Sequence, residues 1–253
     1  MQQHARFEHM WAAFLLAWVA AFSDAIGFLV LQQLGASFMS GNSMATGVAL
    51  GRLNWHAALH SGLPIIIFFI GNMLGFLVRT LARRWHLRSP FAIIFALELV
   101  LLLAFLLWGS RSFSRGSIRP FESGVFYVCT VLLTLAMGLQ TATVRRVQGE
   151  YINTTFITGV LSNWARVLAQ YLPWLREQLV QRSMLQVVRT PVHHASVRHF
   201  VVLSGLWVSY LLGAICGGVL ELRFALTALV FPMVILVGLI VVDLVWPLEL
   251  ERF

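Results

Sequence analysis

Residues 11–34 read WAAFLLAWVAAFSDAIGFLVLQQL, an apolar run that contains one charged residue, Asp24. An α-helix rises 1.5 Å per residue, so about 20 apolar residues are enough to cross the hydrocarbon core of a bilayer. The run is longer than the apolar segment of a secretory signal peptide, which has about 7–15 residues. We therefore interpret it as a first membrane span that the protein retains.

Five more apolar runs follow, at residues 61–82, 90–109, 121–144, 199–220 and 223–246. The whole chain is 59% hydrophobic and 11% charged, with a mean hydropathy of +0.81. Soluble domains carry about 25% charged residues, so this chain has too little polar surface for a water-soluble fold. The sequence predicts an all-α integral membrane protein with six transmembrane helices, surrounded by the lipid bilayer.

The net charge of +8 comes from arginine, because all 18 basic residues are Arg. Most of them lie in short segments between apolar runs, which is typical of membrane proteins whose basic loops stay cytoplasmic. The chain has no basic arm with interleaved aromatic residues, and we expect no nucleic-acid partner. Cys129 and Cys216 lie within apolar runs, which favours packing over a disulfide.

Two pairs of motifs recur in the same order along the chain. ASFMSG at 36–41 resembles TTFITG at 154–159, and GNMLG at 71–75 resembles GAICG at 213–217. The separation grows from 118 residues (36 to 154) to 142 residues (71 to 213), and a polar loop at about 172–198 accounts for the difference. The pattern predicts one membrane domain, residues 1–253, made of repeat one at about 11–109 and repeat two at about 121–246. The spacing of Gly71 with Gly75, and of Gly213 with Gly217, allows close packing of membrane helices.

Each ASFMSG-like motif precedes a short helical segment, at about 42–53 and 158–171. If both segments span the membrane, the 18 arginines divide eleven to seven between the two sides; if both are re-entrant, they divide thirteen to five. The five outer arginines would be Arg52, Arg111, Arg115, Arg119 and Arg223. Because the positive-inside rule favours the more uneven division, we expect two re-entrant half-helices, cytoplasmic termini and two repeats in inverted orientation.

The amino termini of such half-helices would lie near the membrane midplane. Unpaired N–H groups and a partial positive charge suit helix amino termini to an anionic or dipolar solute. Ser40, Asn42 and Thr158 are natural capping residues, and Gly41 and Gly159 permit close backbone approach. The alternative is that these residues only satisfy the helix ends.

Ionisable residues within the spans are functional candidates, because a charge at membrane depth is costly. Asp24 shares a helical face with Gly27, and it has either a pathway role or a structural ion pair. Glu98 lies near the middle of the 90–109 run and needs a partner or a proton. A polar stripe of Thr130, Thr134, Thr141 and Arg145, with Gln140 beside it, either lines a cavity or pairs with Asp24.

Catalytic signatures are missing from the sequence. We find no nucleophile–base pair and no phosphate loop, and His193-His194 lacks a third metal ligand at useful spacing. We expect the protein not to be an enzyme and to need no metal or cofactor.

Two segments resemble signatures of the YoaK family of bacterial six-span membrane proteins, which is grouped as a domain of unknown function. The first is SDAIGF at 23–28 followed by FMSGN at 38–42, and the second is AMGLQTA at 136–142 followed by RR at 145–146 and TTFITG at 154–159. The resemblance extends over about 15–245 and departs from the usual pattern in Ser40, where Thr is commoner. It implies an address in the bacterial inner membrane but no substrate, and it singles out Asp24, Gly27, Ser40, Gly41, Asn42, Gln140, Arg145, Thr158 and Gly159.

These patterns favour a small-solute transporter or channel, with Asp24, Arg145 and Glu98 as gating or proton-coupling residues. The alternative is a non-transporting membrane partner whose polar midplane residues only hold the repeats together. Association into a homo-oligomer stays open, and the sequence does not identify the solute.

Overall fold

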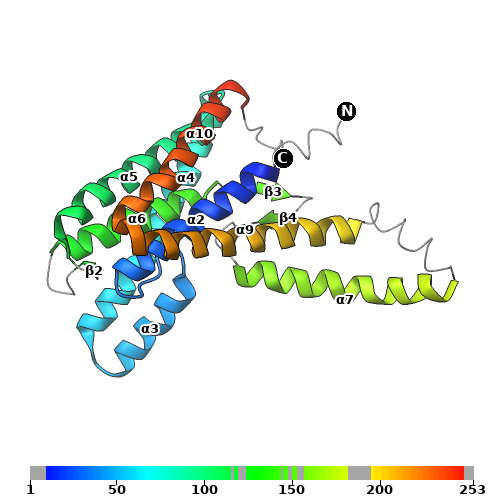
Figure 1. Ribbon diagram of the computed structural model, residues 1–253, viewed down its shortest axis with the longest axis horizontal. Coiled ribbons are helices and arrows are strands. Elements are labelled where there is room, and N and C mark those ends of the chain that lie inside the picture. Colours follow the sequence, from blue (N-terminus) through cyan, green and yellow to red (C-terminus); the bar gives the residue numbers. More distant parts are fainter. Residues whose placement is uncertain are drawn as a thin grey trace.

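The computed structural model describes residues 10–114, 117–118, 124–143, 145–147, 150–152, 157–181 and 195–247. The helices are α2 (Met10–Val30), α3 (Met39–Gly51), α4 (Trp55–Arg84), α5 (Pro90–Ser112), α6 (Gly124–Thr141), α7 (Ile157–Gln181), α9 (Ala195–Phe224) and α10 (Val230–Val245), with a 3-10 turn, η2 (Ala225–Leu229), before α10 (Figure 1). Within these ranges, the extended pairs are two small hairpins, β1 (Phe113–Ser114) with β2 (Ser117–Ile118) and β3 (Arg145–Val147) with β4 (Glu150–Ile152). The predicted all-α class is confirmed.

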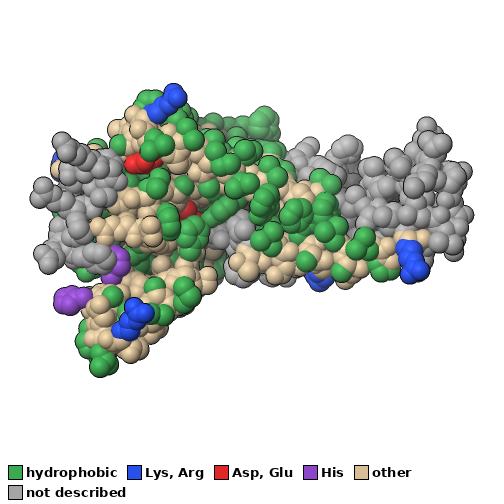
Figure 2. Space-filling view, turned by 60° about the horizontal axis from the view of Figure 1, so that its bottom comes forward, with side chains coloured by type: hydrophobic (Ala, Val, Ile, Leu, Met, Phe, Trp, Pro, Cys, Tyr) green, Lys and Arg blue, Asp and Glu red, His purple; other side chains and the backbone are tan. Residues whose placement is uncertain are grey.

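Several helices are long and apolar enough to cross a membrane. Over the described residues they form five stretches, of which the last, Phe200–Val245, includes both α9 and α10. That stretch is not straight, because Ala225 has a φ of 49° and the chain changes direction at η2 (Figure 1). Large apolar side chains face outward in mid-helix, such as Phe69 at 66% exposed and Val234 at 64%. Figure 2 shows hydrophobic side chains spread over the visible surface of the body, and such a surface fits a multi-pass membrane protein.

Helix α2 ends at Val30, four residues before the apolar run does. Gln32 and Gln33 have left-handed φ values of 56° and 63°, and the Gln33 N–H donates to the Phe28 carbonyl at 2.8 Å. This is the hydrogen-bonded geometry with which many helices end, although glycine usually provides the left-handed residue. The turn sends the chain back toward the body instead of onward.

Helices α2 and α9 run parallel and touch through glycine. A methyl group added at Gly213 would clash with the carbonyl oxygen of Trp18, and one added at Gly217 would lie 2.8 Å from the carbonyl oxygen of Phe22. The Ser209 hydroxyl also donates to the Phe14 carbonyl at 2.6 Å. Only glycine allows the two backbones to come this close.

Helices α4 and α6 make the corresponding parallel contact. A methyl group at Gly71 would lie 2.5 Å from the Leu135 carbonyl oxygen, and one at Gly75 would lie 3.1 Å from the Leu139 carbonyl oxygen. Gly138 of α6 contributes to the same crossing, since a methyl group there would lie 3.1 Å from the Gly71 Cα. Each glycine pair therefore packs on a helix from the other half of the chain.

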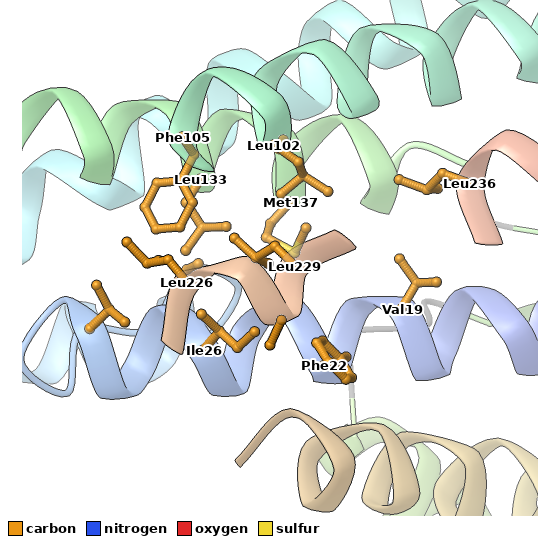
Figure 3. Close-up of a cluster of buried hydrophobic side chains, with 14 of the residues drawn as sticks. Val19, Phe22, Ile26, Leu102, Phe105, Leu133, Met137, Leu226, Leu229 and Leu236 are labelled. Carbon is orange, nitrogen blue, oxygen red and sulfur yellow. The ribbon is translucent and has the colours of Figure 1, made fainter. Parts of the chain in front are cut away.

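Helices α2 and α6 are antiparallel where they meet. The Gln140 Nε2 amide of α6 donates to the Leu16 carbonyl of α2 at 3.4 Å, whereas Leu133 presses against Gly27 farther along α2. Higher residue numbers on α2 thus lie beside lower numbers on α6. The main core fills the space between these helices, α5, η2 and α10, with Val19, Phe22, Ile26, Leu102, Phe105, Leu133, Met137, Leu226, Leu229 and Leu236 close together (Figure 3).

Helix α7 differs from the expected half-helix at 158–171. It continues to Gln181, so the first ten residues of the predicted 172–198 loop are helical, and residues 182–194 lie outside the described chain. Val160 and Val167 pack with Val202 and Leu206 of α9, and Trp164 lies 5.3 Å from the Phe200 ring. These contacts extend α7 along the amino-terminal half of α9, and the two form an arm that projects from the body (Figure 1). In the sequence, Leu168, Leu172, Leu175 and Leu179 continue the helical spacing of apolar residues past residue 171.

Candidate functional site

Asp24 lies at the centre of a contact between α2 and the loop that precedes α3. Its side chain is 1% exposed, and Oδ2 accepts hydrogen bonds from the Ser37 hydroxyl and from the Ser37 backbone N–H. α2 continues for six residues beyond Asp24, or about 9 Å at 1.5 Å per residue. The loop must return that distance along α2 to bring Ser37 to the carboxylate.

Tyr210 of α9 completes this contact from a third direction, since its hydroxyl interacts with both Asp24 and Ser37. Tyr210 is not among the residues expected from the sequence, because nothing in the pattern around it differs from an ordinary aromatic residue in a span. Ser37 and Ser23 stand within the motifs quoted above, yet neither was expected to be a site residue. The signal that could have found them is their position beside Asp24 and beside the turn.

The start of α3 does not have the predicted caps. The helix begins at Met39, and Phe38 at the capping position makes no side-chain hydrogen bond. Ser40 is exposed, whereas Asn42 is buried and its Nδ2 donates to the Gly35 carbonyl at 2.7 Å. Among the described residues, no heavy atom lies within 4 Å of a methyl group placed on Gly41, so no protein group occupies this position and the close approach of a solute to it stays a prediction. Asn42 instead closes the loop, and Asp24 supplies the negative charge near this helix start.

The α6 candidates Gln140 and Thr141 are the last two residues of that helix. Gln140 is fully buried; its amide group donates to Leu16, and its Oε1 atom has no protein partner among the described residues. Thr141 is buried and its hydroxyl donates to the Met137 carbonyl at 2.8 Å. Gly27 faces Leu133, so its lack of a side chain serves helix packing. The structure therefore places Gly27 and Gln140 at the α2–α6 interface, and Asp24 lies about one turn from Gly27 on α2.

A set of buried oxygen atoms without protein partners distinguishes this region. Several hydroxyls on the described helices donate to their own helix four residues back, as Thr46, Ser61 and Thr141 do. Ser23, Thr130 and Thr134 are at most 1% exposed and do not. Of the eight buried oxygens without partners among the described residues, one is Asn72 Oδ1 of α4, and seven belong to α2, α5 and α6: Ser23 Oγ, Asp24 Oδ1, Glu98 Oε1 and Oε2, Thr130 Oγ1, Thr134 Oγ1 and Gln140 Oε1.

The remaining candidates are not joined to Asp24 by any contact within the described chain. Thr158 is exposed and Gly159 is half-buried in the first turn of α7, which packs beside α9. Arg145 begins β3, and its side chain lies outside the described residues, so the Asp24–Arg145 ion pair stays a prediction. The backbone does not favour the pair: α6 reaches Leu16 at Gln140, eight residues or about 12 Å along α2 from Asp24, and Arg145 comes later still.

Comparison with known proteins gives two similarities. The model of a family described as "Protein of unknown function (DUF1275)" matches residues 12–242. The UPF0700 transmembrane protein YoaK of Bacillus subtilis (strain 168) is 26% identical over 149 residues, which is 59% of this chain and 62% of that relative, less than two thirds of its length. No solved structure matches the chain significantly.

Proposed function

Because the chain belongs to the DUF1275 family of membrane proteins, for which no activity is assigned, we propose from its own interior that it is a small-solute transporter or channel. The site would lie near the middle of the membrane, between α2, α5 and α6. No covalent chemistry is needed for this role. The proposal places the protein in the bacterial inner membrane, with both termini in the cytoplasm.

The seven buried oxygens without protein partners carry the proposal. Each buried polar atom left without a hydrogen bond costs about 1–3 kcal/mol, so seven would together cost about 7–21 kcal/mol. That sum is comparable to the whole stability of a typical folded domain, about 5–15 kcal/mol. A dry structural core would not retain such a set, whereas a path for water and solute supplies the missing partners.

The directions of the helices support six crossings. Helix α2 is antiparallel to α6 and parallel to α9, so α6 and α9 run in opposite directions. The end of α6 and the start of α9 would then lie on the same side of the membrane, and α7, which connects them, would start and end on that side. α4 is parallel to α6, so α3 likewise returns the chain to the side on which α2 ends. The return of Ser37 to Asp24 supports a re-entrant path before α3.

The same contacts support an inverted repeat. Gly71 and Gly213 meet the carbonyls of Leu135 and Trp18, and Gly75 and Gly217 meet those of Leu139 and Phe22. The contacted residues are 117 apart in both cases (18 to 135 and 22 to 139), close to the 118 residues between the motifs at 36 and 154. Since α2 and α6 are antiparallel, equivalent helices have opposite directions, as inverted repeats require.

This arrangement suggests how access could alternate. The pairs α2–α9 and α4–α6 each join one helix from either repeat, and they meet at the layer that holds Ser23, Asp24 and Gln140. Rocking of one pair against the other would expose the layer to one side at a time. The hydrogen bond between Asp24 and Ser37 would link Asp24 to this movement. Glu98 and Arg145 are candidates for gating or proton coupling.

Solute uptake into proteoliposomes tests the proposal, with small ions and neutral metabolites as the solutes. We expect uptake of at least one solute above protein-free liposomes, its loss with Asp24→Asn, and its retention with Thr80→Ala, a hydroxyl deletion at an exposed position of α4. Monodisperse elution of each purified variant shows that it folds. Uptake that is equal in wild type, Asp24→Asn and protein-free liposomes for every solute would contradict a transport function.

One observation favours the alternative of a non-transporting membrane partner. Asp24 Oδ2 is engaged by the Ser37 hydroxyl and N–H, which stabilises the turn before α3. If that were the whole role of Asp24, Asp24→Asn would lower stability without any flux to lose. The uptake assay and an unfolding measurement on the same variant separate the two functions.

A further inference from the structure

We infer that the interface between α2 and α6 binds a small monovalent cation, coordinated by Asp24 Oδ1, the Ser23 hydroxyl and the Thr134 hydroxyl of α6. The role of this ion as solute or coupling ion rests on the proposed function; the binding itself does not.

The buried carboxyl side chains of the described chain have no buried basic counterpart. They are Asp24, Glu98, Glu221 and Asp243, and no buried arginine or histidine accompanies them in the described ranges. Asp243 is satisfied, because its Oδ2 accepts the Ala92 N–H at 2.7 Å. When such a carboxyl group is ionised, an interior without a buried cationic side chain attracts cations and repels anions.

The position that an anion would take at the start of α3 is already filled. Asp24 Oδ2 is held by the Ser37 hydroxyl and N–H just ahead of this helix. A second negative group there would face the carboxylate at short range. The anionic solute expected from the sequence therefore fits this helix start poorly.

The other carboxylate oxygen is available for a cation. Asp24 Oδ1 and Ser23 Oγ are buried and without partners among the described residues, and they belong to consecutive residues. The contacts of Leu16 with Gln140 and of Gly27 with Leu133 put Ser23 level with the α6 turn that begins at Thr134. Thr134 Oγ1, at the start of that turn, is unpartnered as well. This level of the two helices thus holds a carboxylate oxygen and hydroxyl oxygens from both of them.

Oxygen-only ligands are those that hard cations prefer. Sites for calcium and magnesium generally use more than one carboxylate, and the described chain has no group of three or more His, Cys, Asp or Glu side chains placed to hold a metal ion. One carboxylate balances one positive charge. The geometry points to an alkali-metal ion instead of a divalent one.

Thermal unfolding of the full chain in detergent, titrated with LiCl, NaCl or KCl against choline chloride at constant ionic strength and pH, tests the inference. A ligand at a hundred times its Kd should raise the Tm by about 5–10 °C, and the rise should saturate. Asp24→Asn should abolish the shift, and Ser23→Ala, which keeps the carboxylate, should raise the half-saturating concentration several-fold. Glu221→Gln, which removes a buried carboxylate elsewhere, should respond as wild type does.

Several results would overturn the site. The first is an equal Tm in all four salts, including a Tm that depends on pH but on none of the cations. The second is a cation-dependent shift that Glu221→Gln also removes. The third is a Tm that changes when chloride is exchanged for gluconate. If Asp24→Asn does not fold, an unchanged half-saturating concentration in Ser23→Ala would overturn it as well. Saturable stabilisation without uptake into proteoliposomes would support the cation site and contradict the transport function. Uptake without stabilisation would support the transport function and contradict the cation site.

Discussion

Replacing Gly213 by alanine puts a methyl group into the contact between α9 and α2. Besides the clash with the Trp18 carbonyl oxygen, the new Cβ would lie 2.9 Å from the Trp18 Cα and 3.0 Å from its carbonyl carbon. These neighbours are backbone atoms within a helix, so no side-chain rotation relieves the overlap. The two helices must move apart along their whole crossing.

The magnitude follows from two opposing effects. Overpacking of this kind costs about 1–3 kcal/mol, while alanine gains about 0.8–1.0 kcal/mol over glycine through its helix propensity. Gly218→Ala provides a matched control on the same helix, because no described heavy atom lies within 4 Å of its added methyl group. The control receives the propensity gain alone, so the two variants should differ by the full packing cost of about 1–3 kcal/mol.

Thermal unfolding of the two purified variants in one detergent measures this difference. For a chain of this size, 1 kcal/mol corresponds to about 2–4 °C, so Gly213→Ala should unfold about 2–12 °C below Gly218→Ala. Gly71→Ala, with Gly62→Ala as its control, should show the same order, because Gly71 occupies the equivalent crossing and the Gly62 methyl meets only Thr46 at 3.5 Å. Equal Tm values within each pair would refute the glycine contacts described above.

Three further outcomes are expected. With Cys129 and Cys216 replaced by Ala, Arg52→Cys should react with a membrane-impermeant thiol reagent from outside and Arg84→Cys only from inside; labelling of both from one side would contradict the six-crossing arrangement. Gln33→Val should lower the free energy of unfolding by about 1–2 kcal/mol, because its left-handed backbone disfavours a branched residue, while Gln33→Gly should not; similar losses would exclude the left-handed turn. Asp24→Asn and Arg145→Gln should have additive effects on stability, since the backbone separates them, and a double-mutant coupling above about 0.5 kcal/mol would restore the ion pair.

Much of the fold could be predicted because membrane helices can be recognised from long runs of apolar residues. The six apolar runs each coincide with a helix, and Gly71, Gly75, Gly213 and Gly217 do lie at helix crossings. Both signals are local, so a single sequence contains them. The end of α2 was missed because Gln32 and Gln33 give no sign of left-handed geometry, which the loop imposes through tertiary contacts.

The candidate site could be predicted in part. Asp24, Glu98 and Gln140 were found because a buried polar group stands out in an apolar run. Their partners were missed because Ser37 and Tyr210 reach Asp24 only through the return of the loop and the crossing of α9, neither of which has a sequence period. The capping roles of Ser40 and Asn42 were wrong because α3 begins earlier, at Met39.

The crossing of α9 on α2 also has a consequence for the order in which the protein is made. Trp18 and Gly213 are 195 residues apart (18 to 213), so a ribosome working at about 5–20 residues per second needs about 10–40 s to supply the second after the first. During that time α2 resides in the bilayer without its partner, although it has the highest buried share, 67%, of the candidate spans. Asp24 and Ser23 meanwhile face lipid, nascent chain or the insertion machinery, and a membrane chaperone that shields this helix would raise the yield. Of the described helices, the one synthesised first is thus among those that wait longest for a partner.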